Sequence, residues 1–238
     1  MTVAWIVAAI TLAQIVKGAT GFGSALVAMP LLASTVAPTE ALGISAAADL
    51  VAGAVLAPGA AKRQAVTALL PLVAAMAIGQ QLGIALLTVL NPNLTSLAIA
   101  SVVAVMAVRV SRPPRALANV GSEGRGLVPG LLGGTMGGLV GMSGPPIVAW
   151  ASQRFPPAAA RDALILIFAA GSLLQIASLT AHGLWRPAAV HLAVIPAVAI
   201  GNLIGIRLAD RLGDDARRSG VAGLLALCAA TLAWQTLP

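Results

Sequence analysis

The chain has 238 residues, of which 59% are hydrophobic and only 9% are charged, whereas soluble domains carry about 25% charged residues. A soluble enzyme or binding domain is therefore excluded, and residues 1–238 are expected to form a single membrane domain. The net charge of +7 fits basic loops that orient a membrane protein, so no nucleic-acid partner is predicted.

Proline, glycine and charged residues divide the chain into apolar segments, which we expect to be helices. Long runs such as 163–181 and 187–206 approach the roughly 20 residues that a helix needs to cross the hydrocarbon core. The predicted fold is an all-α polytopic membrane protein, with about eight to ten membrane segments. In chain order the segments are about 2–16, 23–36, 41–57, 65–89, 94–109, 126–141, 144–153, 162–181, 187–207 and 217–236.

Two pairs of matching stretches indicate an internal duplication. They lie on either side of the longest polar stretch, "RVSRPPRALANVGSEGR" at 109–125. Chance similarity between helices rich in alanine, glycine and leucine is the alternative explanation. The matches pair Gly18, Gly21 and Pro30 with Gly134, Gly137 and Pro146, and "AIGQQLGIAL" (77–86) with "AIGNLIGIRL" (199–208).

The duplication predicts two repeats, at about 1–110 and about 126–238, joined by a basic loop at about 111–125. An odd number of segments in each repeat inverts the second repeat relative to the first. This holds whether the opening pair of each repeat spans the membrane or is re-entrant. We therefore expect two inverted repeats, each of which opens with a broken or re-entrant helix pair.

With the N-terminus outside, this topology gathers the basic residues on one face. Arg186 lies on the opposite face, and Lys17 is left uncounted. Basic loops favour the cytoplasm, so both termini are predicted outside. The residues on the cytoplasmic face are Lys62, Arg63, Arg109, Arg112, Arg115, Arg125, Arg154, Arg161, Arg207, Arg211, Arg217 and Arg218.

The stretch "VKGATGFGS" (16–24) places a lysine beside glycines inside an apolar region. A lysine at the centre of a membrane helix costs roughly 2.5–3.5 kcal/mol, and such residues usually face a cavity or a partner. The helix expected to begin near Gly23 would offer free N–H groups to an anion. The predicted anion-binding residues are Lys17, Gly18, Thr20, Gly21, Phe22, Gly23 and Ser24. Snorkelling of Lys17 to the inner surface is the alternative.

The second glycine-rich stretch, "GGTMGGLVGMSGPP" (133–146), occupies the corresponding place in the second half. Non-helical backbone at membrane depth survives only inside protein or beside water, so paired breaks indicate a transport site. Close packing of helices through small residues is the alternative. From this stretch Gly137, Gly138, Ser143, Gly144 and Pro145 are predicted to complete the anion site.

Three further polar residues lie in apolar segments. Asp49 is a candidate to bind a coupling proton, because desolvation disfavours an ionised carboxylate; pairing with Lys17 is the alternative. Gln80 and Asn202, at matching positions of the repeats, are expected to bond between helices, with pocket lining as the other interpretation. No cluster of cysteine and histidine predicts a metal site, and no cofactor is predicted.

The stretches "GATGFGSALVAMPLL" and "GGTMGGLVGMSGPPIVAW" resemble the paired signature of the TauE/SafE family of permeases, over nearly the whole chain. The resemblance implies a bacterial-type plasma-membrane transporter for a small sulfur-containing anion such as sulfite, thiosulfate, sulfoacetate or an organosulfonate. The lipid bilayer and a coupling proton or sodium ion are its implied partners. The anion, the direction of transport, the coupling ion and the oligomeric state stay open.

Two other functions use the same residues. An anion channel would have the same cage of donors but no coupling to a second ion. An intramembrane enzyme would need a nucleophile, and "GMSGPP" offers a partial nucleophile elbow around Ser143. Pro145 stands where that motif requires its second glycine, and no histidine is placed to activate Ser143, so an enzyme is not predicted.

Overall fold

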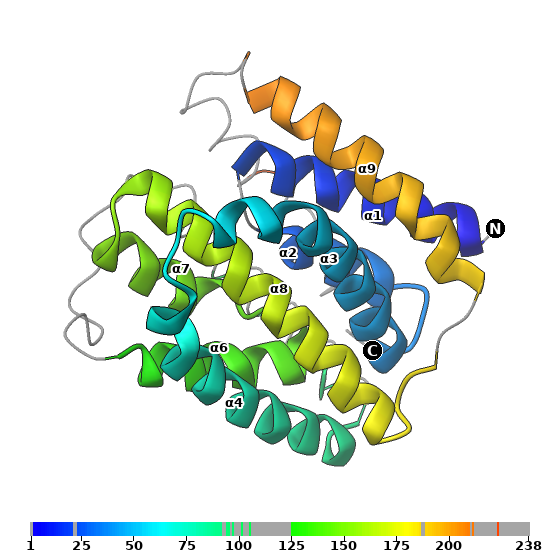
Figure 1. Cartoon of the computed structure of the whole chain (residues 1–238). Coiled ribbons are helices and arrows are strands. Elements are labelled where there is room, and N and C mark those ends of the chain that lie inside the picture. Colours follow the sequence, from blue (N-terminus) through cyan, green and yellow to red (C-terminus); the bar gives the residue numbers. More distant parts are fainter. Residues whose placement is uncertain are drawn as a thin grey trace. The chain divides into compact units, whose positions relative to one another are not determined.

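The computed structural model describes residues 2–20, 23–91, 125–186 and 189–209, together with positions 94, 95, 97, 101, 105, 211 and 223 (Figure 1). No strand occurs among them, so the all-α prediction is confirmed for this part of the chain. The predicted segments at 94–109 and 217–236 lie almost entirely outside it. The helices are α1 (Thr2–Thr20), α2 (Ser24–Ala33), α3 (Pro38–Ala61), α4 (Leu70–Val89), α6 (Leu127–Val140), α7 (Gly144–Arg154), α8 (Pro157–Ala181) and α9 (Ala189–Ala209).

The helices differ from the predicted segments mainly at their ends. Helix α1 continues through Lys17 and Gly18 to Thr20, so the expected end near residue 16 is wrong. A glycine inside a helix is tolerated where a neighbouring helix needs close approach, which is the case at Gly18. Helices α3 and α8 begin several residues earlier than predicted, at Pro38 and Pro157, because proline is readily accommodated in the first turn of a helix.

Three of the described helical segments are long and apolar enough to cross a membrane: Pro38–Ala61, Val66–Val89 and Ala159–Ala181. The second of these includes the 3₁₀ turn Val66–Leu69, which leads directly into α4. The apolar cores of the other helices are shorter, and in α2 and α6 they cover 10 and 14 residues. Helices α2 and α6 are therefore only about 15 and 21 Å long at 1.5 Å per residue, well short of a hydrocarbon core of about 30 Å.

The chain folds into two compact units, each of which draws on both halves of the sequence. Unit 1 consists of 1–48, 90–115 and 187–238, and its described helices include α1, α2 and α9. Unit 2 consists of 49–89 and 116–186, with α4, α6, α7 and α8. Helix α3 begins in unit 1 and ends in unit 2. Within unit 1, α1 lies beside α9, and within unit 2, α4 lies beside α6 (Figure 1).

Glycines bring the paired helices of each unit into backbone contact. In unit 1 a Cβ at Gly205 would collide with the Ile15 carbonyl oxygen, and one at Gly18 would lie 2.5 Å from that of Asn202. In unit 2 a Cβ at Gly83 would collide with the Thr135 carbonyl oxygen. Within the glycine-rich stretches, the small-residue packing that was the alternative explanation applies to Gly18, Gly134 and Gly138, which pack on the main chain of Asn202, Met76 and Gln80.

The contacts of Gly18 and Gly138 with their partner helices are alike. Gly18 packs on the main chain at Asn202, and Gly138 packs in the same way at Gln80. Gly18 and Gly138 are 120 positions apart, whereas the predicted match pairs Gly18 with Gly134. The ends of α1 and α6, at Thr20 and Val140, are separated by the same 120 positions. At this separation Gly18 and Gly21 still fall on glycines, Gly138 and Gly141, whereas Pro30 falls on Trp150 and matches Pro146 only at a separation of 116.

Candidate functional site

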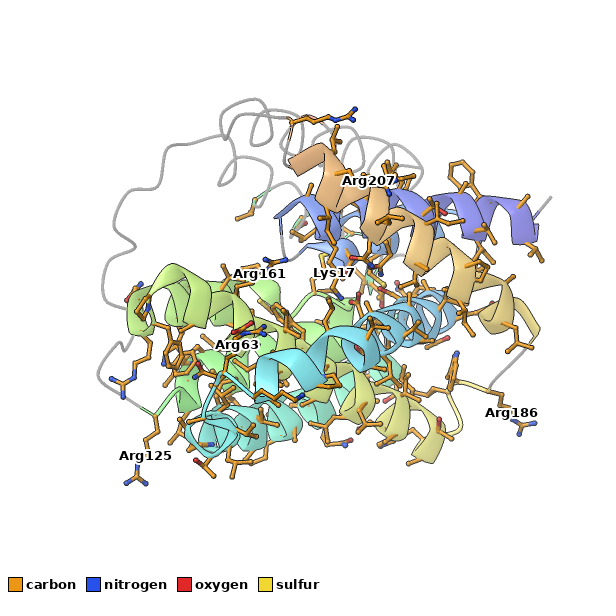
Figure 2. All side chains as sticks on the ribbon, turned by 45° about the horizontal axis from the view of Figure 1, so that its top comes forward. Lys17, Arg63, Arg125, Arg161, Arg186 and Arg207 are labelled. Atoms are coloured by element: carbon orange, nitrogen blue, oxygen red, sulfur yellow. The ribbon has the colours of Figure 1, made fainter. Side chains whose placement is uncertain are left out.

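The first break separates α1 from α2 in unit 1. Helix α1 ends at Thr20, and α2 starts at Ser24 after Gly23, which has a left-handed backbone (φ 88°) that favours glycine. Lys17 lies half-buried in the last turn of α1 (Figure 2), where its charge complements the negative end of the helix dipole. The predicted site residues Gly21 and Phe22 lie outside the described residues.

The N-terminus of α2 presents its main-chain donors to this break. Ser24 is buried and occupies the first helical position, and the first N–H used inside the turn belongs to Leu26, which donates to the Gly23 carbonyl oxygen at 3.1 Å. The N–H groups of Ser24 and Ala25 lie in the first turn of α2, where no carbonyl oxygen of the same helix is placed to accept from them. The first break therefore combines a cation with the positive end of a helix, an arrangement that favours negative charge.

The second break separates α6 from α7 in unit 2 and has fewer groups that suit an anion. Gly141 ends α6 with a left-handed backbone (φ 77°), and Ser143 precedes the first residue of α7, Gly144. Pro145 and Pro146 follow, and neither has an N–H group. The last turn of α6 has no basic residue. The expectation that amides near Gly144 complete an anion cage thus loses two of the usual donors.

Two buried glutamines lie against this second break. Gln80 of α4 is 1% exposed, and its Nε2 donates to the Gly171 carbonyl oxygen of α8 at 3.0 Å. Gln175, one turn further along α8, is also buried, and its Nε2 donates to the Gly137 carbonyl oxygen of α6 at 2.9 Å. A carbonyl oxygen only accepts, so in both amides the NH₂ group must face the main chain. The amide oxygens of Gln80 and Gln175 therefore point away from these two carbonyl groups.

Gly137 is the common neighbour of these polar groups. A Cβ on Gly137 would collide with the Ser143 hydroxyl and would lie 3.7 Å from Nε2 of Gln80. The Ser143 hydroxyl makes no hydrogen bond that caps α7. We call Gln80, Gln175, Ser143 and Gly137 the glutamine cluster. Within the described part of the chain, Oε1 of Gln80 is buried without any hydrogen-bond partner.

The remaining predicted site residues take structural positions. Gly138 is helical and packs on the main chain of Gln80, so it belongs to the α4–α6 contact and not to the break. Asn202 of α9 donates from Nδ2 to Oε1 of Gln14 in α1 at 2.9 Å. The prediction that Gln80 and Asn202 bond between helices is confirmed. Asp49 is half-buried in α3 and makes an interaction.

Sequence reasoning missed Gln14 and Gln175, which supply the partner interactions of Asn202 and Gly137. Each is a lone amide in an apolar helix, and that is the signal that could have identified them. It also missed the ion pair between Arg63 and Asp162, in which Arg63 Nε lies 2.7 Å from Asp162 Oδ2. Figure 2 shows Arg63 at the same end of α8 as Arg161.

Comparison with known proteins gives one match, and it covers nearly the whole chain. The family model described as "Sulfite exporter TauE/SafE" matches residues 6–232. No curated protein and no solved structure matches the chain.

Proposed function

The chain belongs to the TauE/SafE sulfite exporter family, a family of membrane transporters, and we propose that it is a secondary transporter for a small sulfur-containing anion. Sulfite, thiosulfate, sulfoacetate and organosulfonates are the substrates to test. The proposed location is a bacterial-type plasma membrane, with both termini outside, because the basic residues gather on one face of the predicted topology. Transport would proceed by alternating access between two inverted repeats.

The repeat of helix boundaries is the observation that best supports this mechanism. Helices α2 and α7 begin at Ser24 and Gly144, 120 positions apart, and α3 and α8 end at Ala61 and Ala181, at the same separation. Each repeat thus opens with a helix, a glycine-containing break and a short second helix. Paired broken helices at corresponding positions of two repeats are the feature by which transporter binding sites are recognised.

We place the anion at the first break. Lys17 supplies a positive charge, and the N–H groups at the start of α2 and the Ser24 hydroxyl are donors suited to the oxygens of sulfite or a sulfonate. Thr20, Gly21 and Phe22 belong to the same stretch and complete the proposed site. Gly18 is assigned to packing against α9.

The second break does not repeat this chemistry. The position equivalent to Lys17, 120 residues later, is Gly137, and two prolines replace amide donors at the start of α7. The two repeats therefore have different proposed roles. The first repeat binds the anion, and the second repeat supplies a break that has no lysine and fewer N–H donors. Ser143, Gly144 and Pro145 line that environment, while Asp49 is the proposed proton-binding alternative for coupling.

Reconstitution tests the proposed function. The full chain in proteoliposomes loaded with unlabelled anion should accumulate the same radiolabelled anion from outside by counterflow. Sulfite, thiosulfate, sulfoacetate and an aryl sulfonate are compared, with chloride and acetate as negative controls. Counterflow requires a carrier that exchanges one substrate molecule for another. Uptake that only follows the membrane potential, without counterflow, would replace the transporter by a channel, and no uptake of any sulfur-containing anion would contradict the proposal.

A further inference from the structure

The glutamine cluster of unit 2 is a group of neutral oxygens that is short of hydrogen-bond donors. Each glutamine donates a hydrogen bond from its Nε2 to a helix carbonyl oxygen: Gln80 to that of Gly171, and Gln175 to that of Gly137. This arrangement leaves Oε1 of Gln80 buried with no partner among the described residues. An unpartnered buried acceptor costs roughly 1–3 kcal/mol, so a fold that keeps one must supply either a function or a partner for it.

The end of α6 at the second break favours a positive partner. The C-terminal turn of α6 carries the negative end of the helix dipole, and no basic residue neutralises it. The last carbonyl groups of a helix have no donor within it; near the end of α6 the Met136 oxygen accepts from Met142, and the Gly137 oxygen accepts from Gly141 and from Gln175. The start of α7 offers few donors because Pro145 and Pro146 have no N–H. The start of α7 keeps the positive end of its dipole, but it has fewer N–H donors for an anion than the start of α2.

The type of oxygen limits the cation. Divalent ions such as Ca²⁺ and Mg²⁺ are bound in proteins with at least one carboxylate in most sites, and the glutamine cluster contains none. Neutral carbonyl and hydroxyl oxygens replace the hydration shell of monovalent ions. Half-helix ends in transporters coordinate coupling ions in the same way.

From this arrangement we propose that the glutamine cluster binds an alkali cation, Na⁺ or K⁺, with Oε1 of Gln80 as one ligand and the Ser143 hydroxyl as a second. This inference rests on the proposed transport function, for which it supplies the coupling ion. It assigns different ions to the two breaks: the anion to the break with Lys17, and the cation to the break where Gly137 takes its place.

Cation binding is measured on the purified full-length chain without any sulfur anion. Thermal unfolding is followed by tryptophan fluorescence in NaCl, KCl and choline chloride at equal ionic strength. We expect one of the two alkali chlorides to raise the unfolding midpoint above that in choline chloride, saturably, and the salt that acts at the lower concentration identifies the ion. Equal midpoints in all three salts would overturn the proposal and would mean that water satisfies Gln80.

Two α4 glutamines provide a matched pair of variants. Gln80→Leu should abolish the alkali-dependent shift. Gln81→Leu should retain it, because Gln81 also bonds to α8, donating to the Ser178 hydroxyl at 2.6 Å, but is no part of the cluster. A full shift in Gln80→Leu would overturn the proposal. Should that variant not fold, Ser143→Ala is the second test, and we expect it to raise the half-maximal cation concentration by about tenfold; no change would count against the site.

The experiment separates this inference from the proposed function. Binding is measured without anion, and anion counterflow is measured with equal sodium and potassium on both sides of the membrane. Counterflow without any cation-specific shift of the unfolding midpoint would support the transport function and contradict the cation site. A cation-specific shift without counterflow would support the cation site and contradict the transport function, on which the coupling role of the cation rests.

Discussion

The guanidinium of Arg63 binds the Asp162 carboxylate through two hydrogen bonds, of 2.7 and 2.8 Å, in unit 2. The hydrogen bonds to this carboxylate raise the pKa of the Arg63 guanidinium, so the arginine stays charged. The two partners differ in exposure, because the side chain of Arg63 is 62% exposed and that of Asp162 is 12% exposed. The pair fixes the connection after α3 to the first turns of α8.

Because Arg63 is much more exposed than Asp162, we expect substitutions of the two residues to lower stability by different amounts. Arg63→Ala leaves a largely buried carboxylate without its partner, whereas Asp162→Asn leaves an arginine that water can solvate. We expect Arg63→Ala to lower the thermal unfolding midpoint more, and the double variant to recover part of the loss. Midpoints measured in detergent check this. Equal effects of the two single variants would show that the buried carboxylate is not the costly partner.

Backbone contact between α1 and α9 predicts a steep cost for one added methyl group. Gly205→Ala places a Cβ against the Ile15 carbonyl oxygen, and neither helix backbone can move without disturbing the other glycine contacts. Overpacking of this kind costs about 1–3 kcal/mol. Gly144→Ala is the matched control, since its Cβ would meet nothing within 4 Å. A Gly205→Ala protein as stable as Gly144→Ala would contradict the close packing.

We expect Lys17 to contribute to the affinity of the proposed anion site. Losing one charged hydrogen bond costs about 1.5–3 kcal/mol, so Lys17→Gln should weaken anion binding by about tenfold to over a hundredfold. Lys62→Gln is the control, because it removes a lysine from the exposed connection after α3. Calorimetric titration of both variants with the transported anion checks the prediction. An unchanged affinity in Lys17→Gln would favour an interfacial role for this lysine.

Asp49 offers the competing route for coupling. The glutamine cluster has no titratable side chain, so the alkali-dependent shift should be the same in mildly acidic and mildly alkaline buffer, and Asp49→Asn should keep it. Transport by wild type and Asp49→Asn is then compared across a pH series. Parallel profiles are expected if the alkali cation drives transport. A folded Asp49→Asn protein that lost the pH dependence would assign coupling to a proton on Asp49 instead.

The basic loops predict the orientation of the chain. A reporter fused after Arg115 should lie in the cytoplasm, and one fused after Pro238 should lie outside. The pair of fusions samples both sides of the membrane in one protein. Both reporters on the same side would contradict the inverted repeat as well as the topology.

Helix positions could be read from the sequence because hydrophobic runs mark them, but the starts of α3 and α8 at Pro38 and Pro157 lie three and five residues before the predicted segments. The helical state of Lys17 and Gly18 could not, since it depends on α9, which lies far away in the chain. Likewise, glycines at four-residue spacing predict a close contact but not its register. Only the contacts show that Gly138 packs on Gln80 in the way that Gly18 packs on Asn202.

The candidate site was predictable to a different degree in the two breaks. Lys17 is visible in the sequence because a charge in an apolar segment is costly. The character of the second break depends on where two amides point, and that direction follows from the carbonyl oxygens they face. Gln175 in particular gains its significance only from contact with Gly137, which no spacing rule connects to it.

The exchange of helices between the two halves also sets an order of assembly during synthesis. Helix α4 meets its glycine partner as soon as α6 has entered the membrane, soon after residue 140 is made. Helix α1 must wait for α9, since Gln14 and Asn202 are 188 positions apart. Until then the membrane holds α1 with its close-packing surface uncovered, a state open to chaperones and to quality control. Unit 1 is therefore the later of the two to mature, although α1 leaves the ribosome well before α4 does.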